Sequence, residues 1–200
     1  MFFTTDEGHP FRHNPLSAVV TPRPIAWIST RDSDGSVNLA PYSFFNLVAY
    51  TPPQVMFAST LTKPDRDRSK DTVSNIEASG VFCINIAGYA DREAVNLTSA
   101  SAPRGTDEFE LSGVAKADCV TIDCPRVATA PASLECVLDR IIDLEGANNH
   151  LVLGRVQAVH LRDDCIEGDR FNLEAYQPLT RLGYLDYGCI RETFEMKRPK

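Results

Sequence analysis

The sequence predicts a mainly β fold, a closed or partly closed antiparallel barrel with short peripheral helices. Six or more segments rich in Val, Ile and Phe are separated by turn-forming residues, in the order expected of hairpins. Helical segments are few and short, and they do not alternate with strands as in a doubly wound parallel sheet. A length of 200 residues with 43% hydrophobic content suits a single domain around one core.

The first strands are expected to form a hairpin. Residues 25–30 and 37–39 are largely apolar, and the run 31–36 between them contains Asp, Ser and Gly. Gly35 can supply the positive φ that such a turn requires. A third strand is expected over residues 54–58, because the two prolines before it fit the start of a strand but not its interior.

The middle of the chain is expected to contain two short helices around a strand. Asp71 is favourable at a helix start and Gly80 at a helix end, so the first helix spans this interval. A buried strand is expected over residues 81–87. The second helix is expected over 90–98, where acidic residues fall in the first turn and interact favourably with the helix dipole.

The remaining third of the chain continues the β pattern. Residues 100–115 are rich in Ser, Pro and acidic side chains and predict a mobile surface excursion. Two long strands are expected over 134–144 and 151–161, joined by the hairpin loop 145–149. The closing segment 171–187 begins with a short helical stretch. We therefore expect the two long strands to form the largest hairpin of the barrel.

Composition disfavours several classes of function. The net charge of -7 and the pI near 5.1 argue against nucleic acid or an anionic membrane as a partner. Residues 1–15 lack the features of a signal peptide, and no apolar run is long enough to cross a bilayer, so a cytoplasmic location is expected. The six cysteines lack the spacing of a zinc ribbon or a dithiol redox site and are expected to be buried, reduced thiols.

Several common catalytic motifs are not present in the sequence. There is no glycine-rich dinucleotide fingerprint, no phosphate-binding loop ending in Gly, Lys and Ser or Thr, and no glycine-flanked nucleophilic serine. His9 and His13 have Pro10 between them, which disfavours a shared helical metal face, so no metal site is expected. Classical nucleotide-fold, esterase and metalloenzyme functions are therefore disfavoured.

The segment from Pro22 to Thr72 predicts a cofactor cradle. Its small residues and hydroxyl groups would let a flat, polar ligand approach the backbone. Lys70 stands beside the expected helix start, where a cation and the helix dipole can both meet a phosphate.

The order and spacing of these residues resemble the flavin reductase-like, FMN-binding split-barrel family. The resemblance covers roughly residues 15–187. Its segments are 22–25, 28–30, 38–45, 52–53, 70–72, 75–76, 82–85, 150–154, 178–179 and 181–183. The resemblance implies one domain over 1–200 with its core at about 15–187, folded as a six-stranded antiparallel Greek-key split β-barrel with short flanking helices.

The resemblance also implies a set of cofactor-binding residues. The segment 38–43 would line the flavin ring and ribityl chain, while the strand end 58–60 and the later Lys and Thr would approach the phosphate. Hydroxyls suit ribityl and phosphate oxygens because they both donate and accept hydrogen bonds. The candidate residues are Arg23, Asn38, Ala40, Pro41, Tyr42, Ser43, Ser59, Thr60, Lys70, Asp71 and Thr72.

Ordinary structural roles stay open for several of these positions. Asp71 is better explained as a helix cap, and Lys70 alone could be a solvated charge. Arg23 could bind flavin or brace a loop. The core, rather than a stack on a ligand, is the expected place of Phe44, Phe45 and Phe57. Ser43 and Ser59 could be ordinary strand or turn residues.

The catalytic candidates are His150 and Arg181. His150 matches a family histidine on the nicotinamide side of the flavin, where it could orient the hydride donor; a histidine satisfied by the backbone is the alternative. Arg181 could bind flavin or a nicotinamide phosphate, or brace a terminal loop through a carboxylate such as Asp186.

The resemblance thus implies an FMN-binding oxidoreductase, an NADH- or NADPH-dependent flavin reductase, with FAD as an alternative flavin. FMN binding has stronger support than reductase activity. A non-catalytic protein that stores or senses FMN, and a barrel that has lost its ligand, are the alternatives. Family members are homodimers with flavin at the subunit boundary, and reduced flavin could serve a partner monooxygenase.

Overall fold

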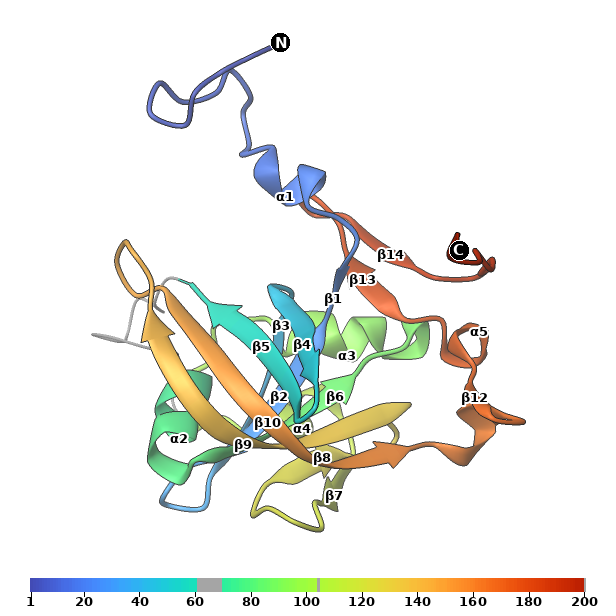
Figure 1. The fold of residues 1–200 in the computed structure, drawn as a ribbon. Helices are drawn as coiled ribbons and strands as arrows, with labels where there is room; N and C mark the ends of the chain where they lie inside the picture. Colours follow the sequence, from blue (N-terminus) through green and yellow to red (C-terminus); the bar gives the residue numbers. More distant parts are fainter. Residues whose placement is uncertain (61–69, 104, 200) are drawn as a thin grey trace.

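The computed structural model describes residues 1–60, 70–103 and 105–199 (Figure 1). Strands predominate, and the helices are short. The largest sheet contains β2 (Ala26–Arg31), β3 (Val37–Tyr42), β4 (Phe45–Tyr50), β5 (Pro53–Ser59), β6 (Val81–Ile86), β9 (Ala132–Asp143) and β10 (His150–Leu161). The smaller sheets contain β1 (Arg23–Pro24) with β13 (Leu179–Arg181) and β14 (Tyr187–Cys189), β7 (Lys116–Asp118) with β8 (Pro125–Val127), and β11 (Ile166–Glu167) with β12 (Arg170–Phe171).

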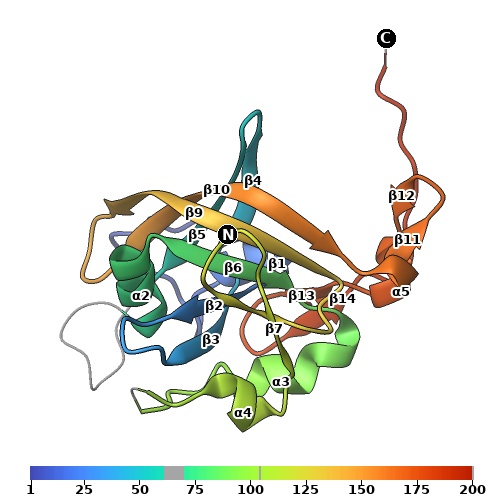
Figure 2. The ribbon, with the colours of Figure 1, turned by 90° about the horizontal axis from the view of Figure 1, so that it is seen from below.

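The helices lie around the sheets. They are α1 (Leu16–Val19), α2 (Asp71–Ser79), α3 (Arg92–Leu97), α4 (Glu108–Ser112) and α5 (Leu173–Tyr176), with the 3-10 turns η1 (Tyr89–Asp91) and η2 (Asp163–Cys165). α3 and α4 contact each other, and α4 also contacts β3, whereas α2 packs on β2 and β3 and contributes Val73 and Ile76 to a different core cluster (Figure 2). None of the helices in the described ranges is long and apolar enough to cross a membrane.

The large sheet has the strand order β3-β2-β6-β9-β10-β5-β4, and every neighbouring pair is antiparallel. Within the described residues this sheet has seven strands, where the expected barrel has six. The additional strand is β4, in which only Phe45 is buried. Successive residues of β4 do not alternate between polar and apolar, so its sequence lacks the alternation that would predict a strand. The sheet curls so that β3 reaches back to contact β5, which produces the expected barrel shape.

The predicted elements are otherwise present with small changes at their ends. The β2–β3 hairpin turns at Gly35, whose φ is 87°. α2 ends at Gly80 in the left-handed conformation. The expected excursion over 100–115 is wrong in part, because α4 forms within it. Asp107 caps this helix by accepting hydrogen bonds from amides of its first turn. The helix also buries Phe109, and both features stabilise it.

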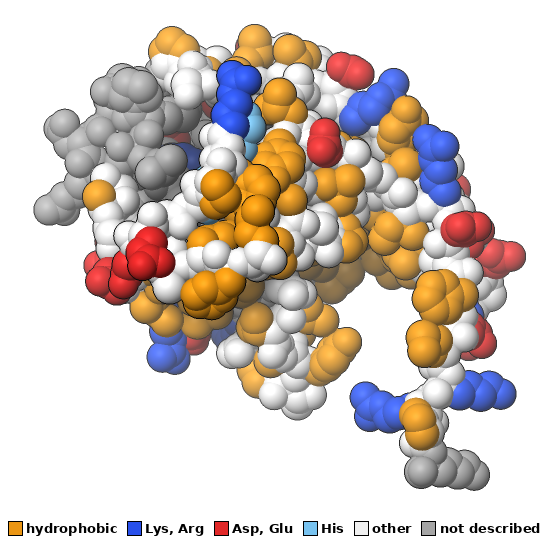
Figure 3. All heavy atoms as spheres, turned by 90° about the horizontal axis from the view of Figure 1, so that it is seen from above, with side chains coloured by type: hydrophobic (Ala, Val, Ile, Leu, Met, Phe, Trp, Pro, Cys, Tyr) orange, Lys and Arg blue, Asp and Glu red, His pale blue; other side chains and the backbone are white. Residues whose placement is uncertain are grey.

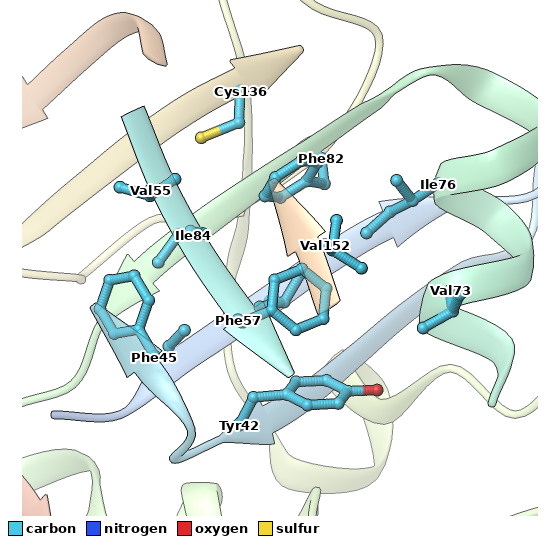
Figure 4. Close-up of a cluster of buried hydrophobic side chains, with 12 residues drawn as sticks. Tyr42, Phe45, Val55, Phe57, Val73, Ile76, Phe82, Ile84, Cys136 and Val152 are labelled. Carbon is cyan, nitrogen blue, oxygen red and sulfur yellow. The ribbon is translucent and has the colours of Figure 1, made fainter. Parts of the chain in front are cut away.

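The main core lies inside the curled sheet (Figure 4). Phe57 and Phe82 pack edge-on with ring centroids 5.8 Å apart, and Phe57 also contacts the ring of Tyr42 at 4.9 Å. Gly154 of β10 lies against Phe82 so closely that a Cβ built there would be 2.4 Å from the ring. A second cluster, around Trp27, joins the other side of β2 to α3 and α4. The sheet therefore separates two apolar layers.

Candidate functional site

Three hydroxyl groups meet at one end of the barrel. Tyr42 ends β3, Ser59 ends β5, and Thr72 lies in the first turn of α2. The Tyr42 side chain forms hydrogen bonds with the side chains of Ser59 and Thr72, and all three residues are buried. Figure 4 shows the Tyr42 oxygen directed toward the side on which α2 stands. We call Tyr42, Ser59 and Thr72 the hydroxyl cluster.

The hydroxyl cluster stays neutral. Burial raises the pKa of Tyr42 to about 12, and the nearby charges of Asp71 and Glu108 add to the rise, although the hydrogen bonds from Thr72 and Ser59 oppose it. Tyr42 therefore keeps its proton at neutral pH and can donate it in a hydrogen bond.

Positive charge lies next to this cluster. The Lys70 ammonium is 5.8 Å from the centroid of the Tyr42 ring, and Lys70 holds the N-cap position of α2 in extended geometry. Asp71 is the first residue of the helix rather than its cap, so the expectation of an Asp71 cap is wrong. The Lys70 charge and the positive end of the α2 dipole thus stand at the same point.

Two polar pairs join α2 to the neighbouring strands β3 and β2. Asn38 Nδ2 donates to Thr72 Oγ1 at 2.9 Å, and Asn75 Nδ2 donates to Thr30 Oγ1 at 3.0 Å. Asn75 was not among the candidates, although its position three residues after Thr72, on the same helix face, is a usable signal.

A buried carboxylate was also missed by sequence reasoning. Glu108 Oε2 accepts a hydrogen bond from the Leu39 amide at 3.0 Å, and Glu108 is only 4% exposed. Glu108 is buried because α4 packs against β3, and the residues around Glu108 in the sequence do not predict this packing.

The remaining members of segment 38–43 continue along β3 into the next turn. Ala40 and Pro41 are partly buried and pair with Ile28 and Trp27 of β2. Ser43 is partly exposed between β3 and β4, and Thr60 is partly buried directly after β5. These four residues stay predictions as ligand contacts.

The aromatic expectations had a mixed outcome. Phe45 and Phe57 lie in the core, as predicted. The prediction is wrong for Phe44, which is 46% exposed and lies 5.7 Å from the Arg23 guanidinium carbon, measured to the ring centroid. Phe44 and Phe45 are neighbours in sequence, so only one of them can turn inward where β4 begins.

Arg23 holds together the chain around the small sheet of β1 and β13. Its guanidinium donates to the carbonyl oxygens of Ser17 at 2.5 Å, Leu182 at 2.6 Å, and Val20. Burial lowers the pKa of Arg23, and the charge of Arg181 lowers it further. These contacts connect the segment before β1 to the segment after β13, while a cofactor contact by Arg23 stays a prediction.

His150 lies beside the hydroxyl cluster, opposite Ser59 in the pairing of β10 with β5. Its Nδ1 is 2.8 Å from Asp143 Oδ1. Nε2 is buried and has no hydrogen-bond partner in the described part of the chain. His150 also lines a cleft of about 470 Å³ together with Val73 and Glu77 of α2. The ring is thus held through one nitrogen and has the other available.

Arg181 lies on a different sheet. Its guanidinium stacks 4.4 Å from the ring centroid of Tyr187 and donates to the Tyr184 carbonyl. In Figures 1 and 2 the start of β10 stands on the left and β13 to the right of it. The structure brings His150, but not Arg181, to the hydroxyl cluster.

The donor set fits a phosphorylated, polyhydroxyl ligand. Neutral hydroxyls, one ammonium group and a helix N-terminus are the groups that bind phosphate and sugar oxygens.

The chain matches known proteins over most of its length. The model of the flavin reductase like domain matches residues 18–180. Nitrilotriacetate monooxygenase component B from Bacillus cereus is 31% identical, with a TM-score of 0.85 over 94% of this chain and 96% of the other. The 2-nitrobenzoate 2-nitroreductase of Pseudomonas fluorescens is 30% identical, with a TM-score of 0.81 over 92% and 88%.

A third structure bears on the fold alone. A Shewanella frigidimarina protein with a split barrel domain is 20% identical, and its TM-score is 0.85 with full coverage of both chains. The split-barrel fold is therefore shared. On the match over residues 18–180, this chain belongs to the flavin reductase like domain family.

Proposed function

We propose that this protein binds FMN and reduces it with NADH or NADPH. The observation that carries the proposal is the neutral hydroxyl cluster of Tyr42, Ser59 and Thr72 beside Lys70 at the start of α2. In this proposal Lys70 and Thr72 hold the phosphate, segment 38–43 lines the ring and ribityl chain, and Ser59 contacts the ribityl or phosphate oxygens. Bound FMN supplies the redox chemistry by accepting hydride.

The direct test is optical. The purified protein is mixed with FMN under anaerobic conditions, and NADH or NADPH is added. The absorption band of oxidised flavin in the blue region is then followed. Bleaching with either nicotinamide supports the proposal. A flavin band that stays unchanged with both would remove the reductase claim while leaving FMN binding intact.

Lys70→Ala should weaken FMN binding by about 10- to 100-fold, because a charge-assisted phosphate contact contributes about 1.5–3 kcal/mol. Riboflavin, which lacks the phosphate, should bind the variant and the parent equally well. Titration of both flavins by fluorescence quenching measures the two affinities. Lys197→Ala, in the exposed tail, is the matched control. An equal loss of affinity for both flavins would contradict a phosphate contact.

His150→Ala should lower turnover about tenfold or more while FMN affinity changes little, because we propose that Nε2 orients the hydride donor. Asp143→Asn should lower turnover in the same direction by a smaller factor, since Asp143 holds the opposite nitrogen. Steady-state kinetics with FMN titration separates the two effects.

The same variant distinguishes the second candidate, a non-catalytic protein that stores or senses FMN. That function needs the hydroxyl cluster but neither His150 nor Arg181, and the stacking of Arg181 on Tyr187 is consistent with a purely structural arginine. Under this alternative the parent shows no nicotinamide-dependent bleaching, and His150→Ala changes nothing.

We also propose that the working unit is a homodimer. β4 is an edge strand of the large sheet and carries the exposed side chains of Leu47, Val48 and Tyr50. Figure 3 shows hydrophobic side chains gathered on the face seen from above. An exposed apolar edge of this kind is typical of an interface. Reduced flavin could then pass to a monooxygenase. A monomer on light scattering would contradict the dimer.

A further inference from the structure

The β7–β8 hairpin covers the side of the large sheet that faces away from the main core. Ser29 Oγ of β2 donates to the Pro125 carbonyl at 2.6 Å, and the Val127 amide donates to Asn85 Oδ1 of β6 at 2.8 Å. Both strand residues are fully buried. This hairpin therefore covers the polar side chains Ser29 and Asn85 on the outer side of β2 and β6.

Three thiols meet beneath the hairpin. Cys83 lies on β6 and is fully buried, whereas Cys119 and Cys124 lie at the tip of the hairpin. The Cys119 side chain forms hydrogen bonds with those of Cys83 and Cys124, and Cys124 Sγ donates to the Ser29 carbonyl at 3.1 Å. All three thiols are free, and Cys83 and Cys124 are buried as expected, whereas Cys119 is partly exposed. The fold brings the three together although their spacing in the sequence gave no sign of a shared site.

Cys119 and Cys124 face each other across the hairpin. In the pairing of β7 with β8, Asp118 stands opposite Pro125, so the next pair outward is Cys119 with Cys124. The Cys119 amide donates to the Cys124 carbonyl at 3.2 Å, which continues the ladder by one step. Directly opposed residues have Cα atoms about 4.5–5.5 Å apart, within the range that a disulfide spans.

The two cysteines differ in access. Cys119 is partly exposed, whereas Cys124 is 3% exposed. Solvent therefore reaches the pair through Cys119. Of the other cysteines, only Cys189 is partly exposed, and it lies on β14 outside this group.

The protonation states of the group are also unequal. Hydrogen bonding with the side chains of Cys124 and Cys83 lowers the pKa of Cys119, and nearby His160 adds to this, although burial and the charge of Glu135 oppose it. Hydrogen bonding to Cys119 and burial raise the pKa of Cys83 and of Cys124. The accessible thiol is thus the one favoured as a thiolate, and thiolates are the reactive form.

We propose that Cys119 and Cys124 form a reversible dithiol–disulfide site, oxidised by hydrogen peroxide, that is separate from the proposed flavin site. The described residues contain no group of three His, Cys, Asp or Glu side chains arranged for a metal ion, so a metal centre does not compete with this assignment. Cys83 interacts with Cys119 through a side-chain hydrogen bond, and its place within the sheet on β6 disfavours it as the disulfide partner.

The reaction balances in two steps. The Cys119 thiolate attacks one oxygen of hydrogen peroxide, the O–O bond breaks, and the departing hydroxide takes a proton to leave as water, with Cys119 oxidised to the sulfenic acid. The Cys124 thiol then attacks the Cys119 sulfur, the S–O bond breaks, and a second water leaves. One peroxide is reduced for each disulfide formed. A small dithiol such as dithiothreitol reverses the reaction by exchange.

Peptide mapping of the unmodified chain tests the proposal. Trypsin cleavage after Lys116 and Arg126 releases residues 117–126, which contain both cysteines. After brief treatment with hydrogen peroxide and alkylation, this peptide should lack two hydrogens and carry no alkyl group. Dithiothreitol should restore two alkylatable thiols. In the untreated protein, Cys119 should alkylate about tenfold or more faster than Cys189 at pH 7, because the lowered pKa of Cys119 favours its reactive thiolate.

Three variants assign the roles. Cys124→Ser should abolish the disulfide and let dimedone trap the Cys119 sulfenic acid, while Cys83→Ser should still form the disulfide. Cys189→Ser is the control and should match the parent. The proposal is overturned if peptide 117–126 keeps two free thiols, if Cys119 links to Cys83, or if Cys119 reacts no faster than Cys189. None of these results depends on flavin binding.

Discussion

Glu135→Gln should lower the free energy of unfolding by about 3 kcal/mol and the melting temperature by roughly 10 °C. Glu135 is fully buried, yet its carboxylate accepts hydrogen bonds from the Val120 and Thr121 amides, each at 2.7 Å, and approaches His160 Nε2 at 2.5 Å. Glutamine keeps the shape but presents an amide nitrogen to one of these donors. A buried donor that loses its acceptor costs more free energy than the bond contributed.

The same carboxylate predicts how acid acts on the protein. Burial alone would raise the pKa of Glu135, but hydrogen bonds from Thr121, His160 and Val120 outweigh it and lower the pKa to about 2. A lowered pKa means that the folded state favours the ionised form. This contribution to stability is therefore complete above the ordinary glutamate pKa and is lost as the pH falls toward 2.

Urea unfolding at pH 7 and at pH 4 measures both effects. The parent should lose more stability between these pH values than Glu135→Gln, which has no carboxylate to protonate. Glu145→Gln, in the exposed β9–β10 loop, is the matched control and should follow the parent. Equal unfolding free energies for Glu135→Gln and the parent at pH 7 would contradict the proposed role of Glu135.

Gly154→Ala should destabilise the protein by about 2 kcal/mol, although replacing glycine by alanine within a strand usually stabilises it slightly. A Cβ at this position would be 2.4 Å from Cζ and 2.9 Å from Cε1 of Phe82. Phe82 is fully buried between Phe57 and the strands of the sheet, so the ring has little room to retreat.

A double-mutant cycle isolates this clash. Phe82→Leu removes the ring edge that the new Cβ would meet, so the Gly154→Ala substitution should cost less in that background than in the parent. Thermal unfolding of the four proteins gives the coupling free energy. Arg155→Val, at the adjacent exposed position of β10, controls for a change of strand propensity. If the two changes in unfolding free energy are strictly additive, the contact between the new Cβ and the Phe82 ring contributes nothing to the destabilisation.

Short stretches of sequence were enough to predict most of the strands and helices. The β2–β3 hairpin, α2 with its Gly80 end, and the β9–β10 hairpin follow from alternation, caps and turn residues in short windows. β4 and α4 escaped prediction for different reasons. β4 buries only its first residue and lacks alternation, whereas α4 is a short helix that depends on its Asp107 cap and on the packing of Phe109.

The members of the hydroxyl cluster were named from the sequence, but their mutual contact could not be predicted from it. Tyr42, Ser59 and Thr72 were all candidates, yet their hydrogen-bonded contact requires three elements to end at one place. The pairing of Cys119 with Cys124 likewise depends on a hairpin register, and the burial of Glu108 on helix packing. Such contacts between distant segments leave no trace in a local sequence window.

The bracing by Arg23 has a consequence for how this sequence can drift during evolution. All three acceptors are main-chain carbonyls, of residues 17, 20 and 182, so the side chains there can change without loss of the contact. Arg23 itself has no such freedom. A lysine carries its donors on a single atom, which cannot reach carbonyls in three directions as a planar guanidinium does. The link between the segments before β1 and after β13 thus depends on the identity of one side chain, Arg23, and at the other three positions on main-chain oxygens that every residue carries.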